Sequence, residues 1–185
     1  TELFRTFLSQ TTATDVEISN DNKYLAYGEV DASGSFIQSN VKIISIEKAQ
    51  TDPSNSIEYI YPAESKEIIV DLKYQDNNKL ICMYDDSIHI IENNSDKKIL
   101  DISNTKNTFA DINLKDSVVC ITEKSSGLFA NIDVEITNVT NNKTNVYNID
   151  GAATSIRALE NVIVVNLGTE VDFINTNGWL IKKYN

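Results

Sequence analysis

The sequence has little of what several common kinds of protein require. Cys82 and Cys120 are its only cysteines, so it offers neither a disulfide scaffold nor a Cys/His cluster with the spacing of a metal site. No apolar run approaches the roughly 20 residues of a membrane-spanning helix, and no signal-peptide pattern opens the chain. These shortages exclude a disulfide-rich module, a zinc-binding module and a spanning helix within this sequence.

Positive charge is also scarce. The 185 residues carry 16 Lys and Arg against 27 Asp and Glu, which gives a formal net charge of -11 at pH 7. A nucleic-acid backbone or an anionic membrane surface attracts a basic protein, so we expect neither as a partner of this chain. The length and a hydrophobic content of 41% are typical of a soluble globular domain.

Short segments rich in Val, Ile, Tyr and Phe dominate what is present. Clusters of Asn, Asp, Ser and Gly interrupt them about every six to ten residues, which is typical of strands separated by turns. Residues 41–46 and 131–137 are examples. Residues 64–67 and 158–160 could each form one helical turn at most, and no longer segment has the 3.6-residue period of a helix. The sequence predicts an all-β protein.

Four similar units follow one another along the chain. Each unit has two strongly apolar segments, then a third segment of one common form, such as Val41-Lys42-Ile43, and then a more polar fourth segment. The units recur about every 40 residues, after a longer first interval. Four strands in a repeat of this length are typical of a β-propeller blade.

A propeller also explains why both faces of these strands are apolar. A twisted sheet of this kind needs a neighbouring sheet on each side to keep its faces dry, and polar outer strands protect the exposed edge. We predict an all-β β-propeller segment covering 1–185, with four-stranded blades at about 14–62, 66–103, 108–150 and 154–185. A plain β-sandwich is the alternative, although it does not require a four-strand period.

Residues 1–10 lie outside the four units, and we expect them to form one further strand. A complete four-bladed ring fits the length, but part of a larger propeller, with seven or eight blades, is the expectation we favour. The terminal blades of such a part expose apolar faces, so we also predict that two copies pair as a homodimer.

The segment Ile18–Tyr27 resembles the strand–turn–strand motif of TolB-like and WD40-like propeller repeats, with Asn20 and Asn22 replacing the usual Pro and Gly. Further stretches look like an uncharacterised family of clostridial (Firmicutes) proteins, namely residues 3–6, 18–27, 38–45, 83–91 and 168–179. In that family a single N-terminal membrane helix precedes a propeller-like domain of unknown function. The resemblance implies a tethered, extracytoplasmic protein, and it implies no catalytic or binding residues.

Three aspartates align at the start of the first strand of their units. They are Asp15, Asp71 and Asp111, and Ser155 stands at this place in the fourth unit. One hypothesis is a ring of carboxylates that binds a hard cation or a basic ligand in a central channel. The other is that each side chain accepts backbone N–H bonds where the chain enters a blade. Recurrence along the scaffold favours the backbone role.

The cysteines and the single histidine are expected to be structural. Alignment of the units places Cys82 and Cys120 with Ala26 and Val164 on the second strand, which predicts small buried apolar side chains and no disulfide. His89 has no Ser, Cys or Asp partner that the sequence identifies, so we expect an ordinary strand residue and not a general base.

The last unit contains a strong turn signal. Asn177-Gly178 predicts a two-residue hairpin between the third and fourth strands, and the neighbouring Phe173 and Trp179 are expected to pack between blades. The acidic pair Asp85-Asp86 is adjacent on a turn and cannot by itself supply the opposed carboxylates of a glycosidase.

No catalytic pattern emerges, because the sequence has neither a phosphate-binding glycine loop nor the Ser-x-Asp-x-Gly box of sialidase-type propellers. We predict a non-catalytic binding or scaffold module of an extracytoplasmic bacterial protein, without metal or cofactor, which binds a protein or a small ligand through its blade loops. A propeller hydrolase with its catalytic residues on other blades is the alternative, and a purely structural spacer is a third hypothesis.

Overall fold

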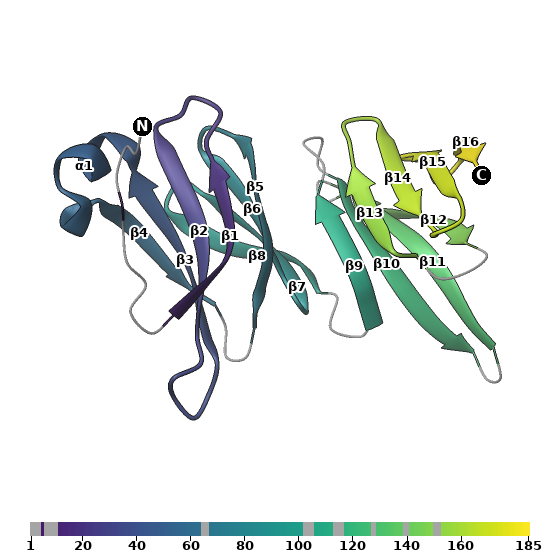
Figure 1. Cartoon of the computed structure of the whole chain (residues 1–185), viewed down its shortest axis with the longest axis horizontal. Coiled ribbons are helices and arrows are strands. Elements are labelled where there is room, and N and C mark those ends of the chain that lie inside the picture. Colours follow the sequence, from purple (N-terminus) through teal and green to yellow (C-terminus); the bar gives the residue numbers. More distant parts are fainter. Residues whose placement is uncertain are drawn as a thin grey trace. The chain divides into compact units, whose positions relative to one another are not determined.

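The computed structural model describes residues 5, 11–63, 67–101, 106–112, 117–126, 129–138, 141–149 and 153–185 (Figure 1). The strand expected at 1–10 lies outside these residues, apart from Arg5. The chain divides into two compact units, Thr1–Ile102 and Ser103–Asn185. Each unit holds two four-stranded antiparallel sheets. The predicted all-β class and the four four-stranded sheets are confirmed.

In the first unit, strands pair in the order in which they occur in the sequence. Sheet 1 consists of β1 (Thr11–Ile18), β2 (Tyr24–Asp31), β3 (Gln38–Ser45) and β4 (Ile57–Pro62). Sheet 2 consists of β5 (Ile69–Asp76), β6 (Lys79–Tyr84), β7 (Ser87–Glu92) and β8 (Ser95–Asp101). The first strand of each sheet is therefore one edge, and the fourth strand is the other.

The second unit repeats this arrangement. Sheet 3 consists of β9 (Lys106–Ile112), β10 (Ser117–Ser126), β11 (Phe129–Asn138) and β12 (Lys143–Ile149). Sheet 4 consists of β13 (Ser155–Ala158), β14 (Val162–Asn166), β15 (Val171–Asn175) and β16 (Leu180–Tyr184).

A short helix between β3 and β4 is a feature that the sequence pattern did not predict. Helix α1 (Ile46–Thr51) begins after Ser45, whose hydroxyl accepts the N–H of Lys48, and a 3₁₀ turn (Pro53–Asn55) follows it. Its Ala49 packs on one face of sheet 1. Fewer than two turns of helix are too short to give a recognisable period. No helix in the described residues is long and apolar enough to cross a membrane.

The two sheets of the first unit pack face to face. Sheet 1 contributes Ala26, Val41 and Ile43 to a common buried core. Sheet 2 contributes Ile69, Leu72, Tyr74, Leu80, Cys82, Tyr84 and Ile91. The sheets approach so closely at Gly28 that a Cβ atom there would lie 2.7 Å from Cγ2 of Ile69, which explains why this position has no side chain.

The second unit buries an equivalent layer between sheets 3 and 4. Sheet 3 contributes Val134, Ile136 and Ile149. Sheet 4 contributes Ile156, Ala158, Ile163, Val165 and Ile174. A pair of sheets is the smallest assembly that keeps one apolar face of each sheet away from water. This need for a neighbour is the physical reason that similar four-stranded sheets follow one another along the chain.

Candidate ligand-binding site

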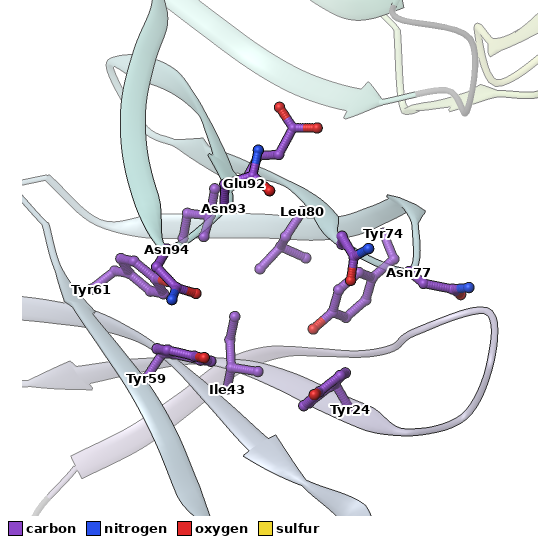
Figure 2. Close-up of a pocket in the computed structure, with 12 residues that line it drawn as sticks. Tyr24, Ile43, Tyr59, Tyr61, Tyr74, Asn77, Leu80, Glu92, Asn93 and Asn94 are labelled. Atoms are coloured by element: carbon purple, nitrogen blue, oxygen red, sulfur yellow. The ribbon is translucent and has the colours of Figure 1, made fainter.

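A cleft of about 450 Å³ opens between sheets 1 and 2 at one end of the first unit (Figure 2). Its floor is apolar and belongs to the core just described. Ile43 of β3 meets Tyr74, Leu80 and Ile91 of sheet 2 there, and at most 8% of each of these residues is exposed. The volume lies in the range of about 300–1,000 Å³ that is usual for small-molecule sites.

Tyrosine side chains from sheet 1 form the walls. Tyr59 pairs with Ile43 and Tyr61 pairs with Val41, so the side chains of β4 face sheet 2 together with those of β3. The rings of Tyr59 and Tyr61 stack with their centroids 6.2 Å apart, and Tyr24 lies at the start of β2. All three tyrosines are half-buried, so each keeps ring surface open to a ligand.

The rim consists of exposed polar side chains on two hairpin turns of sheet 2. Asn77 and Asn78 connect β5 to β6, whereas Asn93 and Asn94 connect β7 to β8. Asn93 and Asn94 both have positive φ angles, of 52° and 60°, which is the geometry of a tight hairpin turn. Four amide groups are thus presented on short, well-defined turns.

The cleft is close to electrically neutral. Glu92, which is exposed, is the one charged residue of the described lining, and the lining holds no lysine, arginine or histidine. Burial is the main cause that raises the pKa of Tyr74 and the pKa of Tyr61, so both hydroxyls are protonated at neutral pH. The polar groups of the cleft are therefore mainly hydroxyls and amides.

These hydroxyls and amides have no hydrogen-bonding partner within the described part of the protein. This holds for the hydroxyls of Tyr59, Tyr61 and Tyr74 and for the side-chain amides of Asn93 and Asn94. Figure 2 shows Tyr24 and Tyr59 on the sheet 1 side of the cleft, and Asn93 and Asn94 on the side of sheet 2. The cleft thus combines a dry floor with polar groups that are available to a ligand.

A smaller pocket of about 240 Å³ occupies a related place in the second unit. Asn141, Asn145 and Asn177 line it, together with Thr176. Here two of the amides are engaged: Nδ2 of Asn145 donates to the carbonyl of Thr176 at 2.9 Å, and Oδ1 of Asn141 accepts the N–H of Lys143 at 3.0 Å. This pocket can serve as a control within the same protein when binding to the cleft of the first unit is measured.

The aligned aspartates contact the backbone. Oδ2 of Asp15 accepts the N–H of Leu72 at 2.7 Å, and Oδ2 of Asp111 accepts the N–H of Ala158, also at 2.7 Å. Oδ1 of Asp71 lies 3.1 Å from the same nitrogen of Leu72. Both N–H groups lie on strands at a sheet edge, where no further strand of the described residues pairs with them.

These bonds are of the kind that the backbone hypothesis predicts, with one correction. The carboxylates of Asp15 and Asp111 accept N–H groups from the next sheet of the same unit, and not from the start of their own sheet. The backbone nitrogen of Ala158, which bonds to Asp111, corresponds to that of Leu72, which bonds to Asp15. The residue before Ala158 is Arg157, so Arg157, and not Ser155, is the counterpart of Asp71. Among the described residues, no group of His, Cys, Asp or Glu could hold a metal ion.

Cys82 is a free and fully buried thiol, and burial raises its pKa well above the usual value. The side chain of Cys120 lies outside the described residues. The structure corrects the predicted alignment of Ala26 with Cys82 by one residue. Leu72 pairs with Cys82, and the equivalent Val16 pairs with Tyr27, so Tyr27 and not Ala26 is the counterpart of Cys82. One residue of slip reverses the face of every side chain in a strand.

The same slip affects sheet 4. Val164, which was aligned with Cys82, is half-buried, whereas its neighbours Ile163 and Val165 are buried in the core. β13 pairs with β14 without a bulge, whereas β5 has one between Tyr74 and Asp76, so the sequence pattern alone does not reveal this offset.

His89 has partners that the sequence did not reveal. Its Nδ1 atom lies 2.9 Å from Oδ1 of Asp96, its Nε2 atom lies 3.7 Å from Oε1 of Glu67, and its ring contacts Tyr84 edge-on. Ser87 donates to the same Glu67 oxygen at 2.6 Å. His89 and Glu67 are 4% and 3% exposed, so this is a buried polar network between the sheets.

Two expectations for the last unit need correction. The tight turn runs from Asn175 to Gly178, with the N–H of Gly178 donating to the carbonyl of Asn175, so Thr176 and Asn177 are its central pair. Gly178 follows with φ 79°. Trp179 is 70% exposed and does not pack between sheets, because it leaves the turn beyond the end of β15. Phe173 is half-buried and contacts Tyr184.

Residues 7–185 match the family of unknown function DUF5711, and the chain belongs to that family. No curated protein matches the chain.

Solved structures with a similar fold come from distant proteins. Hsv2 from Kluyveromyces lactis superposes with a TM-score of 0.54 at 11% identity, over 95% of this chain and 63% of Hsv2. A protein of unknown function from Bacteroides caccae gives 0.51 at 15% identity, over 88% and 57% of the two chains. A fragment of HIRA gives 0.50 at 11% identity, over 93% and 55%.

Hsv2 and HIRA are β-propellers, and the predicted β-propeller fold is thereby confirmed. At such low identity the likeness concerns the fold alone. The chain spans less than two thirds of the length of each of these three proteins' solved chains.

Proposed function

We propose that this chain is a non-catalytic binding domain and that its ligand site is the cleft between sheets 1 and 2. One observation carries the proposal: hydroxyl and amide groups that have no partner among the described residues surround a floor of buried apolar side chains. A pocket that is mostly apolar, with a few convergent polar groups, is the usual form of a small-molecule site.

The composition of the cleft supports binding without catalysis. A general acid or base works best when its environment moves its pKa toward neutrality, and a nucleophile needs a base beside it. The described lining offers one carboxylate, Glu92, on the solvent-exposed rim, and it offers no histidine, cysteine or serine.

The test is a chemical-shift titration of the ¹⁵N-labelled protein with single small molecules: glucose, N-acetylglucosamine, glycerol, choline and inorganic phosphate. We expect at least one probe to move the amide signals of Tyr24, Tyr59 and Asn94 saturably. The signals of Asn141 and Thr176 in the smaller pocket are the internal control and should not move. The proposal fails if no probe affects the cleft, or if the bound probe is converted to a product.

We further propose, on the family resemblance described above, that the domain functions outside the cytoplasm as part of a tethered bacterial protein. The test is the native protein in intact cells, treated with an external protease. Digestion without lysis supports the proposal, and digestion only after lysis contradicts it.

A further inference from the structure

We infer that the ligand of the cleft is a carbohydrate. This inference rests on the proposed function, and it specifies the chemical class that the site takes. Four properties of the cleft lead to it: the type of its hydrogen-bonding groups, its lack of effective charge, its tyrosine walls and the rigidity of its rim.

The hydrogen-bonding groups match hydroxyls. A sugar hydroxyl is both a donor and an acceptor, and so are a tyrosine hydroxyl and an asparagine side chain. The tyrosine hydroxyls and the amides of Asn93 and Asn94 line the cleft without partners among the described residues. A ligand that carries many hydroxyls on a compact ring can engage several of these groups at once.

The charges disfavour an ionic ligand. An anion would find no basic side chain in the described lining, and the chain as a whole carries -11. A cation would find one carboxylate, Glu92, but this side chain is exposed on the rim, where water and salt screen its charge. An uncharged polar ligand is the class that remains.

The tyrosine walls match the apolar face of a sugar ring. The face of an aromatic ring is electron-rich, and it attracts the weakly positive C–H groups of a pyranose as well as excluding water from them. Tyr59 and Tyr61 stack on one another at an interplanar angle of 30° and are half-buried, so they form one continuous wall. Leu80 and Ile43 supply the dry surface beneath.

The rim is held in place before a ligand arrives. The backbone N–H of Asn78 donates to Oδ1 of Asp76 at 2.8 Å, which fixes one turn. Beside the wall, Nζ of Lys48 lies 2.8 Å from Oε1 of Glu58, which tethers helix α1 to the strand that carries Tyr59. A preorganised site loses less conformational entropy on binding, which matters for ligands as weakly apolar as sugars.

The experiment compares saccharides with a competing class. Saturation-transfer NMR and calorimetry are carried out with glucose, N-acetylglucosamine, maltotriose and chitotriose, and with choline, because aromatic sites also bind quaternary ammonium groups. We expect at least one saccharide to bind, trisaccharides to bind more tightly than single sugars, and choline not to bind.

Variants assign the binding to the wall. Tyr59→Ala should weaken saccharide binding about tenfold, since it removes a central aromatic contact. Tyr59→Phe keeps the ring and should lose only about two- to fivefold, the value of one hydroxyl contact. Thr176→Ala, in the smaller pocket of the second unit, should bind as the parent does. Dispersion of the NMR spectrum shows whether each variant is folded.

The outcomes separate the inference from the proposed function. If choline binds at the cleft and no saccharide does, the carbohydrate inference is wrong and the binding function stands. If no probe binds, both are wrong. If a saccharide binds but Tyr59→Ala and Tyr59→Phe leave its affinity unchanged, the site lies elsewhere and the inference is overturned.

Discussion

The two sheet pairs share one frame and differ in how their facing side chains are engaged. Ile43 pairs with Tyr59 in the first unit, and Ile136 pairs with Asn145 at the corresponding place in the second. Tyr59 leaves a cleft of about 450 Å³, whereas Asn145 bonds to the carbonyl of Thr176 beside a pocket of about 240 Å³. The same position of the fourth strand therefore holds a tyrosine beside the larger cleft and a hydrogen-bonded asparagine beside the smaller pocket.

A second pair of positions shows the same contrast. Tyr61 pairs with Val41, and Tyr147 pairs with Val134. The hydroxyl of Tyr147 donates to Oδ2 of the buried Asp172 at 2.8 Å, but that of Tyr61 has no such partner among the described residues. The propeller frame therefore accommodates either arrangement, and the side chains that face the neighbouring sheet decide how large the space between two sheets is.

The largest expected effect tests the part of the frame that the two units share. Asp111→Ala should lower the free energy of unfolding by about 2–3 kcal/mol, because it leaves the N–H of Ala158 without its charged acceptor in a buried place. Asp15→Ala should cost less, about 1–2 kcal/mol, because Asp15 is only half-buried and water can reach the N–H of Leu72.

Urea unfolding at pH 7 measures both losses. Asp111→Asn, which keeps an acceptor oxygen of the same reach, is the matched control and should recover part of the stability. Equal and negligible losses in the two alanine variants would show that these bonds do not hold the sheets together.

The next effect sharpens the contrast between the two tyrosines. Tyr147→Phe should lower the free energy of unfolding by about 1.5 kcal/mol, since it removes a hydrogen bond to a buried carboxylate. Tyr61→Phe should change it by less than about 0.5 kcal/mol. Thermal unfolding of both variants checks this, and a larger loss for Tyr61→Phe would contradict the comparison.

Alkaline pH provides a related test on Tyr84. Its hydroxyl is buried and has no hydrogen-bonding partner in the part of the chain that the structure describes, and burial raises its pKa. Above pH 10 the unfolded chain loses this proton while the folded protein keeps it, so stability falls as pH rises, by about 1.4 kcal/mol per pH unit for such a group. Below pH 10 the group makes no pH-dependent difference.

Tyr84→Phe should therefore be at least as stable as the parent at pH 7, because it removes a buried hydroxyl without a partner among the described residues, and its advantage over the parent should be about 1.4 kcal/mol larger at pH 11 than at pH 7. Tyr147, whose pKa is raised to about 12 by burial and by its bond to Asp172, is the comparison in the second unit. Urea unfolding at the two pH values measures the difference. Parallel loss of stability in parent and variant would argue against a protonated, buried Tyr84.

The smallest effect on stability concerns the other face of sheet 1. Val16 pairs with Tyr27 and points away from sheet 2, and both Val16 and Ile18 are about half exposed, at 51% and 48%. The double variant Val16→Lys with Ile18→Lys should change stability by less than about 0.5 kcal/mol. It should nevertheless abolish the predicted pairing of two copies, which light scattering at micromolar concentration measures. A monomeric parent protein would refute the pairing itself.

Much of the fold could be predicted because its signals are local. Alternation of apolar and polar residues, and turns rich in Asn and Asp, mark the strands of all four sheets. The candidate site could not be predicted in this way. Tyr24, Tyr59 and Tyr74 resemble ordinary strand residues, and they meet only because two separate sheets place them on one cleft.

The register in which the strands pair could not be predicted from the sequence either. A bulge lies between Tyr74 and Asp76 in β5, whereas β1 has none between Asp15 and Ile18, so matching the apolar patterns of the second strands placed them one residue out of register. The partners of His89 were missed because Glu67 lies on the connection before β5 and Asp96 lies beyond the next turn, so no short motif joins them.

The sequence by itself determined the strands, their grouping into fours and the need of each sheet for a neighbour, because these depend on residues close together along the chain. Only the tertiary structure decided which faces of the sheets meet and that Asp15 and Asp111 bind the edge of the next sheet. It also decided that a cleft lies between sheets 1 and 2, whereas a hydrogen bond from Asn145 to Thr176 joins sheets 3 and 4. Those outcomes depend on the approach of whole sheets, which a strand pattern read along the chain does not contain.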